Sequence, residues 1–170
     1  LVVLAAFIQL ASWFLLLRQF VNAYKRCKQF ITPIVSLTLL ILATAVSIKL
    51  VLQFGSVIPA VSQLAFGFRT IIIAYLHLVL LGIVSLFLVV YLFQQQFLHL
   101  SKHAIQAFIL FILGVYLNEL LLGIQGVASI FYFGLPYWNE LLFAVSLLIL
   151  VSVIYLLFSQ KTCDSFNAQV

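Results

Sequence analysis

The chain has 170 residues, of which 66% are hydrophobic and 6% are charged, and its mean hydropathy is +1.33. Soluble domains carry about 25% charged and about 45–50% apolar residues, so this composition excludes a soluble globular domain and a disordered chain. The net charge of +5 comes from eight Lys and Arg residues. These are too few and too scattered for a nucleic-acid-binding surface. We therefore expect one integral membrane domain over residues 1–170, with the lipid bilayer as its surroundings.

Five apolar stretches are predicted to cross the membrane. Each should be a helix, because an open strand cannot satisfy its backbone hydrogen bonds in lipid. The predicted fold class is therefore an all-α, polytopic transmembrane helix bundle. The first stretch has only 17 residues and starts at Leu1 without a Met, so we expect the sequence to be an N-terminally truncated fragment. The five stretches are residues 1–17, 34–52, 70–93, 104–122 and 141–158.

Polar residues mark the ends of several of these stretches. Thr32 followed by Pro33 suits a helix N-cap with Pro in the first turn. Ser101 and Asn139 are further N-cap candidates. Between the second and third stretches, apolar residues recur at helical spacing over residues 56–67. This pattern predicts a short helix that lies in the membrane interface.

Lys and Arg are distributed unevenly between the two sides of the predicted bundle. Six of them lie in or near residues 18–28, residues 94–103 and the C-terminal tail, whereas only Lys49 and Arg69 lie near the opposite ends of the spans. Cytoplasmic loops of membrane proteins are enriched in Lys and Arg. We therefore predict a cell-membrane protein whose N-terminus in this sequence lies outside and whose C-terminus is cytoplasmic. Residues 123–139 should then form a long outer connection.

Ionisable residues within predicted spans are candidates for function, since they are costly in lipid. Lys49, Glu119 beside Asn118, and Glu140 all lie toward the predicted outer side and form a candidate polar cluster in the membrane. Arg69 lies at the same side, and we expect it close to Glu119 or Glu140. The alternative is a set of interfacial ion pairs in which Lys49 extends its ammonium group outward.

His77 is the one histidine within a predicted span, about 10 Å past Thr70 at 1.5 Å per residue. Neutral imidazole is a common ligand of haem iron. The alternative is a hydrogen bond to Asn118 or to a backbone carbonyl. We expect His77 to face the bundle interior, because a lipid-facing N–H would have no partner. His99 and His103 are interpreted as interfacial residues, because no Cys, Asp or Glu nearby completes a metal site. One face of the third predicted span carries His77 together with Thr70, Ile73, Leu81 and Val84, and Gly82 and Ser85 lie beside that face.

Residues 69–82 read Arg-Thr-Ile-Ile-Ile-Ala-Tyr-Leu-His-Leu-Val-Leu-Leu-Gly. This stretch resembles the tenth helix of the catalytic subunit of haem–copper oxidases and their stand-alone relatives, which carry Ala-His-x-His before an apolar residue. That helix also runs from outside to inside and is followed by two more spans, as predicted here. The positions that match are Ala74, His77, Leu78, Leu81 and Gly82.

The resemblance implies a degenerate relative that represents the last five helices of that subunit. His77 takes the place of the low-spin haem ligand, and Arg69 stands where arginines approach the haem propionates. Tyr75 occupies the place of the oxygen-site histidine and is a further candidate haem-binding residue, since Tyr can also ligate haem. The resemblance therefore does not imply oxygen reduction. It implies one low-spin haem b for electron transfer or redox sensing, or the loss of haem.

Two other functions stay open from the sequence. One is a cofactor-free membrane scaffold or assembly factor. The other is a small transporter that uses Lys49, Arg69, His77 and Glu119 as a proton or substrate path. If haem is bound, no other histidine reaches the depth of His77, so the second axial ligand must come from missing N-terminal helices or from a partner chain.

Overall fold

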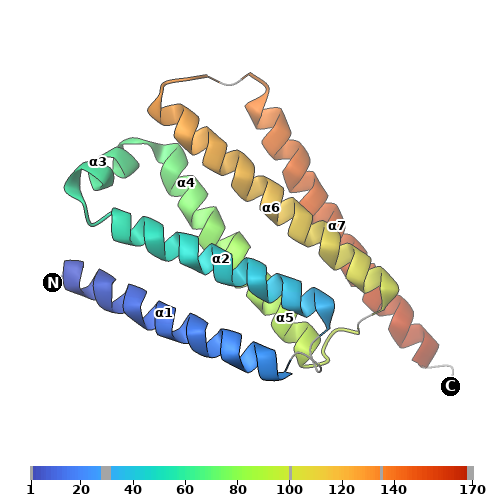
Figure 1. Cartoon of the computed structure of the whole chain (residues 1–170). Coiled ribbons are helices and arrows are strands. Elements are labelled where there is room, and N and C mark those ends of the chain that lie inside the picture. Colours follow the sequence, from blue (N-terminus) through green and yellow to red (C-terminus); the bar gives the residue numbers. More distant parts are fainter. Residues whose placement is uncertain (1, 28–31, 100, 135, 168–170) are drawn as a thin grey trace.

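The computed structural model describes the backbone of residues 2–27, 32–99, 101–134 and 136–167, with the side chains of 27, 64–66 and 161–167 excepted. Within these ranges the structure is helical and contains no strand, which confirms the all-α fold class (Figure 1). The elements in chain order are α1 (Val2–Cys27), α2 (Pro33–Gly55), α3 (Pro59–Gly67), α4 (Arg69–His77), the π-helix η2 (Leu78–Ser85), α5 (Leu86–Gln94), α6 (Lys102–Ile130) and α7 (Trp138–Asn167).

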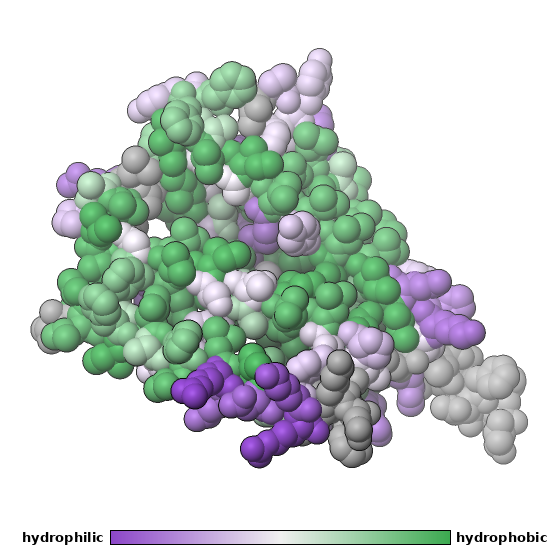
Figure 2. Space-filling view, in the orientation of Figure 1, coloured by the Kyte–Doolittle hydropathy of each residue, from purple (hydrophilic) through white to green (hydrophobic). Residues whose placement is uncertain are grey.

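Five helical segments in the described ranges are long and apolar enough to cross a membrane. The third is a single span, Arg69–Gln94, made of α4, η2 and α5 in succession. Apolar side chains cover most of the face seen in Figure 2. A surface of this kind is stable in lipid and not in water. The protein is therefore a multi-pass integral membrane protein. The five segments are Val2–Arg26, Pro33–Gly55, Arg69–Gln94, Lys102–Ile130 and Trp138–Gln160.

Three helices continue well past the ends of their predicted apolar stretches, and one of them, α7, reaches Asn167 rather than ending near Phe158. The first helix continues ten residues past Leu17 to Cys27, since Lys and Arg are good helix formers and a cation in the last helical turn is favourable. The fourth helix continues to Ile130, so residues 123–130 are helical rather than part of a long connection. A Cβ atom added at Gly126 would meet Ile71 of α4 at 3.6 Å, so this extension packs closely on α4.

The predicted helix caps have mixed outcomes. Thr32 and Pro33 begin α2 as expected, although the Thr32 side chain makes no capping hydrogen bond. The hydroxyl of Ser101 accepts a hydrogen bond from the Ala104 amide at 3.1 Å and caps α6. Asn139 is not an N-cap, because α7 already begins at Trp138. The short helix predicted over residues 56–67 is present as α3, although it begins three residues later, at Pro59.

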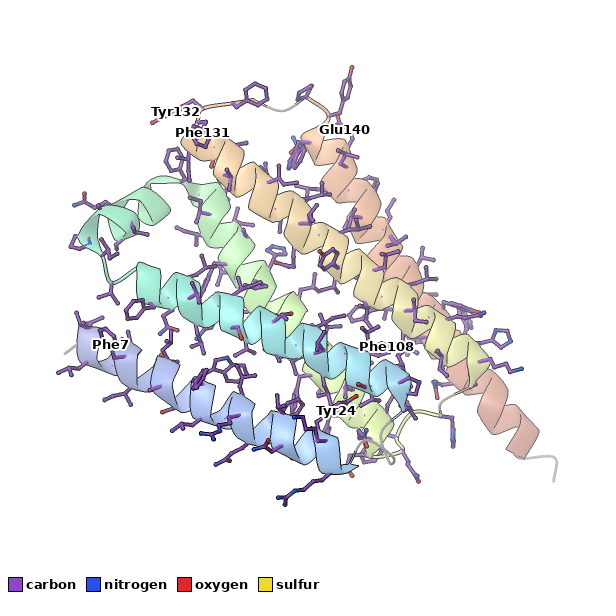
Figure 3. All side chains as sticks on the ribbon, viewed as in Figure 1. Phe7, Tyr24, Phe108, Phe131, Tyr132 and Glu140 are labelled. Carbon is purple, nitrogen blue, oxygen red and sulfur yellow. The ribbon has the colours of Figure 1, made fainter. Side chains whose placement is uncertain are left out.

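The hydrophobic core lies in the half of the bundle where α2 and α6 begin and α5 ends. Phe108 is almost fully buried, and its ring lies 5.3 Å from that of Phe93, centroid to centroid (Figure 3). Leu86 of α5 and Val35 of α2 complete this core beside α6. His77 comes before this core in the third span, in the half of the bundle that includes the α3 end of α4.

Candidate functional site

The imidazole of His77 is held by its own helix. Its Nδ1 lies 2.9 Å from the backbone carbonyl oxygen of Ile73, one turn earlier. A carbonyl oxygen can only accept a hydrogen bond, so Nδ1 carries a hydrogen, and in the neutral imidazole the lone pair is then on Nε2. The described part of the chain provides no hydrogen-bond partner for Nε2, and the side chain is exposed. The ring is therefore oriented with its ligating nitrogen free.

His77 is exposed in the described chain, and the expectation that its ring faces the bundle interior stays a prediction. Its premise was that an imidazole N–H facing lipid would have no partner. The Ile73 carbonyl removes that cost, because it accepts the Nδ1 hydrogen bond within the helix. Thr70 was predicted to lie on the same helix face as His77, and it does contact α6. Its hydroxyl oxygen lies 2.8 Å from that of Ser129.

A π-helix begins directly after His77. It covers Leu78–Ser85, and the Ser85 hydroxyl donates to the Leu80 carbonyl, five residues back, at 2.9 Å. Gly82 is buried within it, and a Cβ atom added there would lie 4.0 Å from Cγ of Glu119. Gly82 therefore faces the Glu119 side chain of α6. π-helical turns are rare and are frequent at functional sites.

Asn118 and Glu119 bring buried polar atoms to the same place. Asn118 is only 7% exposed, and neither its Nδ2 nor Oε1 of Glu119 has a hydrogen-bond partner in the described residues. His77 lies close enough to Glu119 to interact with it electrostatically. The structure therefore brings together three of the predicted site residues, His77, Asn118 and Glu119. Gly82, which the sequence analysis placed only beside the His77 face, faces the third of them.

Arg69 does not join this group. Its side chain is exposed at the first residue of α4, and it forms no ion pair with Glu119 or Glu140 in the parts of the chain that the structure describes. The contact of Thr70 with Ser129 places the start of α4, and so the neighbouring Arg69, level with Ser129 of α6. Ser129 is ten residues from Glu119, or about 15 Å along α6 at 1.5 Å per residue. The expected contact of Arg69 with Glu119 is therefore wrong.

Lys49 and Glu140 also lie apart from His77. The ammonium group of Lys49 donates to Oε1 of Gln53 at 2.7 Å, and the amide of Gln53 donates to Gln9 of α1 at 3.0 Å. Lys49 thus belongs to the contact between α1 and α2. Glu140 is exposed in the first turn of α7, where a carboxylate is favoured by the helix dipole (Figure 3).

Tyr75 is half-buried on α4, two residues before His77. Side chains two residues apart on a helix do not face each other. Tyr75 and His77 therefore point to different sides of α4. They cannot both bind to one face of a planar ligand.

The two remaining histidines form hydrogen bonds at the other end of the bundle. Nδ1 of His103 lies 3.0 Å from the Tyr155 hydroxyl, which donates to Gln106 at 3.3 Å. The backbone amide of His99 donates to Gln160 at 2.8 Å. Within the described residues, no group of three or more His, Cys, Asp or Glu could hold a metal ion. These histidines therefore connect α7 to α6 and to the preceding loop.

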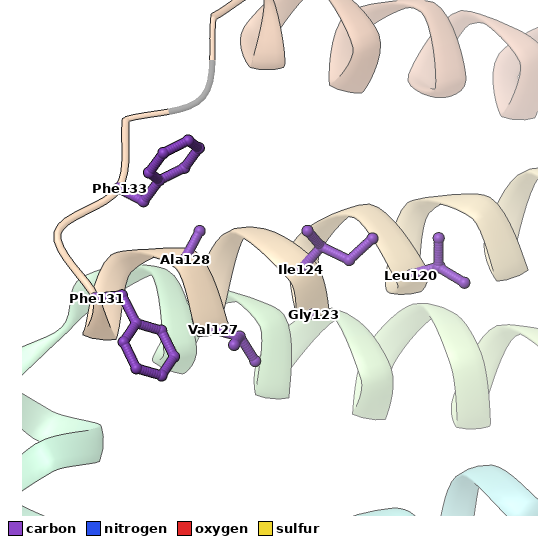
Figure 4. Close-up of a pocket in the computed structure, with 7 residues that line it drawn as sticks. All are labelled: Leu120, Gly123, Ile124, Val127, Ala128, Phe131 and Phe133. Carbon is purple, nitrogen blue, oxygen red and sulfur yellow. The ribbon is translucent and has the colours of Figure 1, made fainter.

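An apolar hollow of about 720 Å³ lies along α6 and the loop that follows it (Figure 4). All seven residues that line it are apolar, so it offers no group for catalysis or for metal binding. They are Leu120, Gly123, Ile124, Val127, Ala128, Phe131 and Phe133.

The five spans define the class as a multi-pass membrane protein, and His77, Asn118 and Glu119 form a polar group on its third and fourth spans. Comparisons with known protein families, with curated proteins and with solved structures found no match to this chain.

Proposed function

We propose that this membrane protein binds one low-spin haem b through Nε2 of His77 and serves in electron transfer or redox sensing. The observation that carries the proposal is the hydrogen bond from Nδ1 of His77 to the Ile73 carbonyl. A histidine ligand usually donates its other ring N–H to a carbonyl or a carboxylate, which fixes the tautomer and directs the lone pair to the metal. The resemblance of residues 69–82 to the haem-binding helix of haem–copper oxidases supports the same role.

The residues around His77 fit such a group. The exposed imidazole leaves space on the Nε2 side, and the bound haem would supply one-electron redox chemistry. Arg69 lies eight residues earlier, about 12 Å along the helix axis. It is exposed and has no ion pair in the described chain, so its guanidinium group is available to a propionate.

The second axial ligand comes from outside the described residues in this proposal. The third span continues as helix from His77 to Gln94, a distance of about 25 Å at 1.5 Å per residue. His99 and His103 follow that end and so lie too far away to share an iron with His77. A histidine on another chain, or on sequence beyond these residues, is the expected partner. The position of Tyr75 gives no reason to propose oxygen reduction.

A second candidate function rests on a separate observation. The buried polar atoms of Asn118 and Glu119, which His77 influences electrostatically, favour a site for a proton or a small polar solute within the membrane. A small transporter would use such a site. A cofactor-free scaffold or assembly factor would need neither this site nor a free Nε2.

A reduced-minus-oxidised absorbance spectrum tests the haem proposal. The protein is produced with added haem precursor, purified in detergent, and compared with its His77→Ala and His103→Ala variants. Both histidines are exposed, and each makes one ring hydrogen bond. We expect the His77→Ala variant to lose the low-spin haem bands and the His103→Ala variant to keep them.

The outcomes separate the three functions. An unchanged haem spectrum in the His77→Ala variant contradicts the ligand assignment. Absence of haem, together with proton uptake into vesicles that the Glu119→Gln variant abolishes, favours the transporter. Absence of both haem and transport leaves the scaffold.

A further inference from the structure

We propose that the groove between α1 and α2 binds one phospholipid with an anionic headgroup. The groove has a volume of about 820 Å³. It is lined by Leu17, Phe20, Val21 and Tyr24 from α1 and by residues 36–48 of α2. It lies away from His77 and belongs to neither function considered above.

The length of the groove suits a lipid of a single leaflet. From Ser36 to Ile48 the lining of α2 extends for twelve residue steps, or about 18 Å. The hydrocarbon core of a bilayer is about 30 Å thick, so one leaflet contributes about 15 Å. An acyl chain laid in the groove would therefore reach from the headgroup region to the middle of the membrane.

The hydroxyl groups of the groove already have partners within the protein. The hydroxyl oxygens of Tyr24 and Ser36 are 2.6 Å apart. Thr44 donates to the Ile41 carbonyl, and Ser47 donates to the Ala43 carbonyl. Because these polar groups are satisfied, the groove presents an apolar surface to its occupant. An acyl chain fits that surface better than a polar ligand does.

Positive charge flanks the α1 side of the groove, from Arg18 beside Leu17 to Lys25 beside Tyr24. Arg18 and Lys25 are exposed on α1 and stand three residues before and four residues after Val21, which lines the groove. Residues at these spacings share one side of a helix. Figure 2 shows hydrophilic side chains gathered below the C-terminal half of α1.

No acidic residue offsets this charge locally. The sequences of α1 and α2 contain no Asp or Glu. The two acidic side chains that the structure describes, Glu119 and Glu140, lie on α6 and α7. Basic residues beside a membrane surface attract anionic headgroups, and each contributes about fivefold to binding. An anionic phosphate ester at Arg18 and Lys25 therefore completes the site.

Retention of lipid by the purified protein tests this proposal. The protein in detergent is incubated with phosphatidylglycerol or with phosphatidylcholine of identical acyl chains, and bound lipid is counted by native mass spectrometry. We expect one phosphatidylglycerol to be retained in preference to phosphatidylcholine. The Arg18→Gln/Lys25→Gln variant should bind it about 30-fold more weakly, because two charges are removed. Both residues are exposed, so folding should be unaffected.

Two controls keep the test specific. Lys102→Gln removes an exposed charge at the start of α6, away from the groove, and should leave retention unchanged. Ala43→Phe fills the groove and should abolish retention while Arg18 and Lys25 stay in place. Equal retention of the two lipids overturns the proposal, as does an equal loss in the Lys102→Gln variant. Competition by inorganic phosphate as strong as that by phosphatidylglycerol also overturns it, because the site would then recognise the anion alone.

Discussion

Substituting Gly114 tests the closest helix contact in the bundle. Gly114 lies buried on α6 where α7 crosses. A Cβ atom added there would lie 2.8 Å from Cγ1 of Ile149 and 3.1 Å from Cδ2 of Leu148. The first distance is shorter than real Cβ contacts allow, and Cγ1 is not the free end of its side chain. The Gly114→Ala variant therefore requires Ile149 to change its conformation or α7 to move away from α6.

The expected magnitude follows from two opposing terms. Overpacking of this kind costs about 1–3 kcal/mol. Replacing glycine by alanine in a helix gains up to about 1 kcal/mol. Gly123 lies on the same helix, and a Cβ atom added there would have nothing within 4 Å. Because both substitutions share the propensity gain, Gly114→Ala should be less stable than Gly123→Ala by about 1–3 kcal/mol.

Unfolding in mixed micelles by increasing sodium dodecyl sulfate measures this difference. A third variant, Gly114→Ala in an Ile149→Ala background, removes the nearest clashing atom and should recover part of the loss. If Gly114→Ala is as stable as Gly123→Ala, the tight crossing of α6 and α7 is wrong.

Three further predictions concern other parts of the fold. Ser101→Ala should destabilise the protein by about 0.5–2 kcal/mol because it removes the cap of α6, whereas Ser101→Asp should retain most of the stability; a null effect in the same unfolding assay would contradict the cap. Trp13→Phe and Ser47→Ala should each cost about 0.6 kcal/mol and should not be additive, because the indole N–H of Trp13 donates to Ser47 at 3.0 Å; additive losses would argue against that bond. A reporter fused after Val170 should be active only in the cytoplasm, because Lys and Arg are concentrated on that side; activity only outside the cell would reverse the topology.

The existence and class of the five spans could be predicted from the sequence because apolar length alone decides them. Their ends could not be placed from the charges alone. Arg18 ended the predicted first span, yet the helix continues to Cys27, because a charged side chain near the interface is compatible with helix. The fourth helix extends beyond its predicted end to Ile130, where Gly126 packs on α4. That contact joins distant parts of the chain, so local sequence does not reveal it.

The candidate site was predictable only in part. The sequence analysis placed His77 and Glu119 on the correct spans, but their electrostatic interaction depends on the register of α4 on α6. The same register separates Arg69 from Glu119. The bond of Lys49 to Gln53 is an i, i+4 contact within one helix, and that spacing could have revealed it. No sequence pattern predicted the π-helix, because the residues from Leu78 to Ser85 are equally compatible with an α-helix.

Rescue of a His77→Gly variant by free imidazole tests the central proposal most directly. His77 is exposed, so the substitution leaves space for a free imidazole and little packing is lost. The purified variant should lack the low-spin haem spectrum, and millimolar imidazole should restore it, whereas N-methylacetamide at the same concentration should not. A low-spin spectrum in the His77→Gly variant without imidazole, or one that no concentration of imidazole restores, would contradict His77 as the axial ligand.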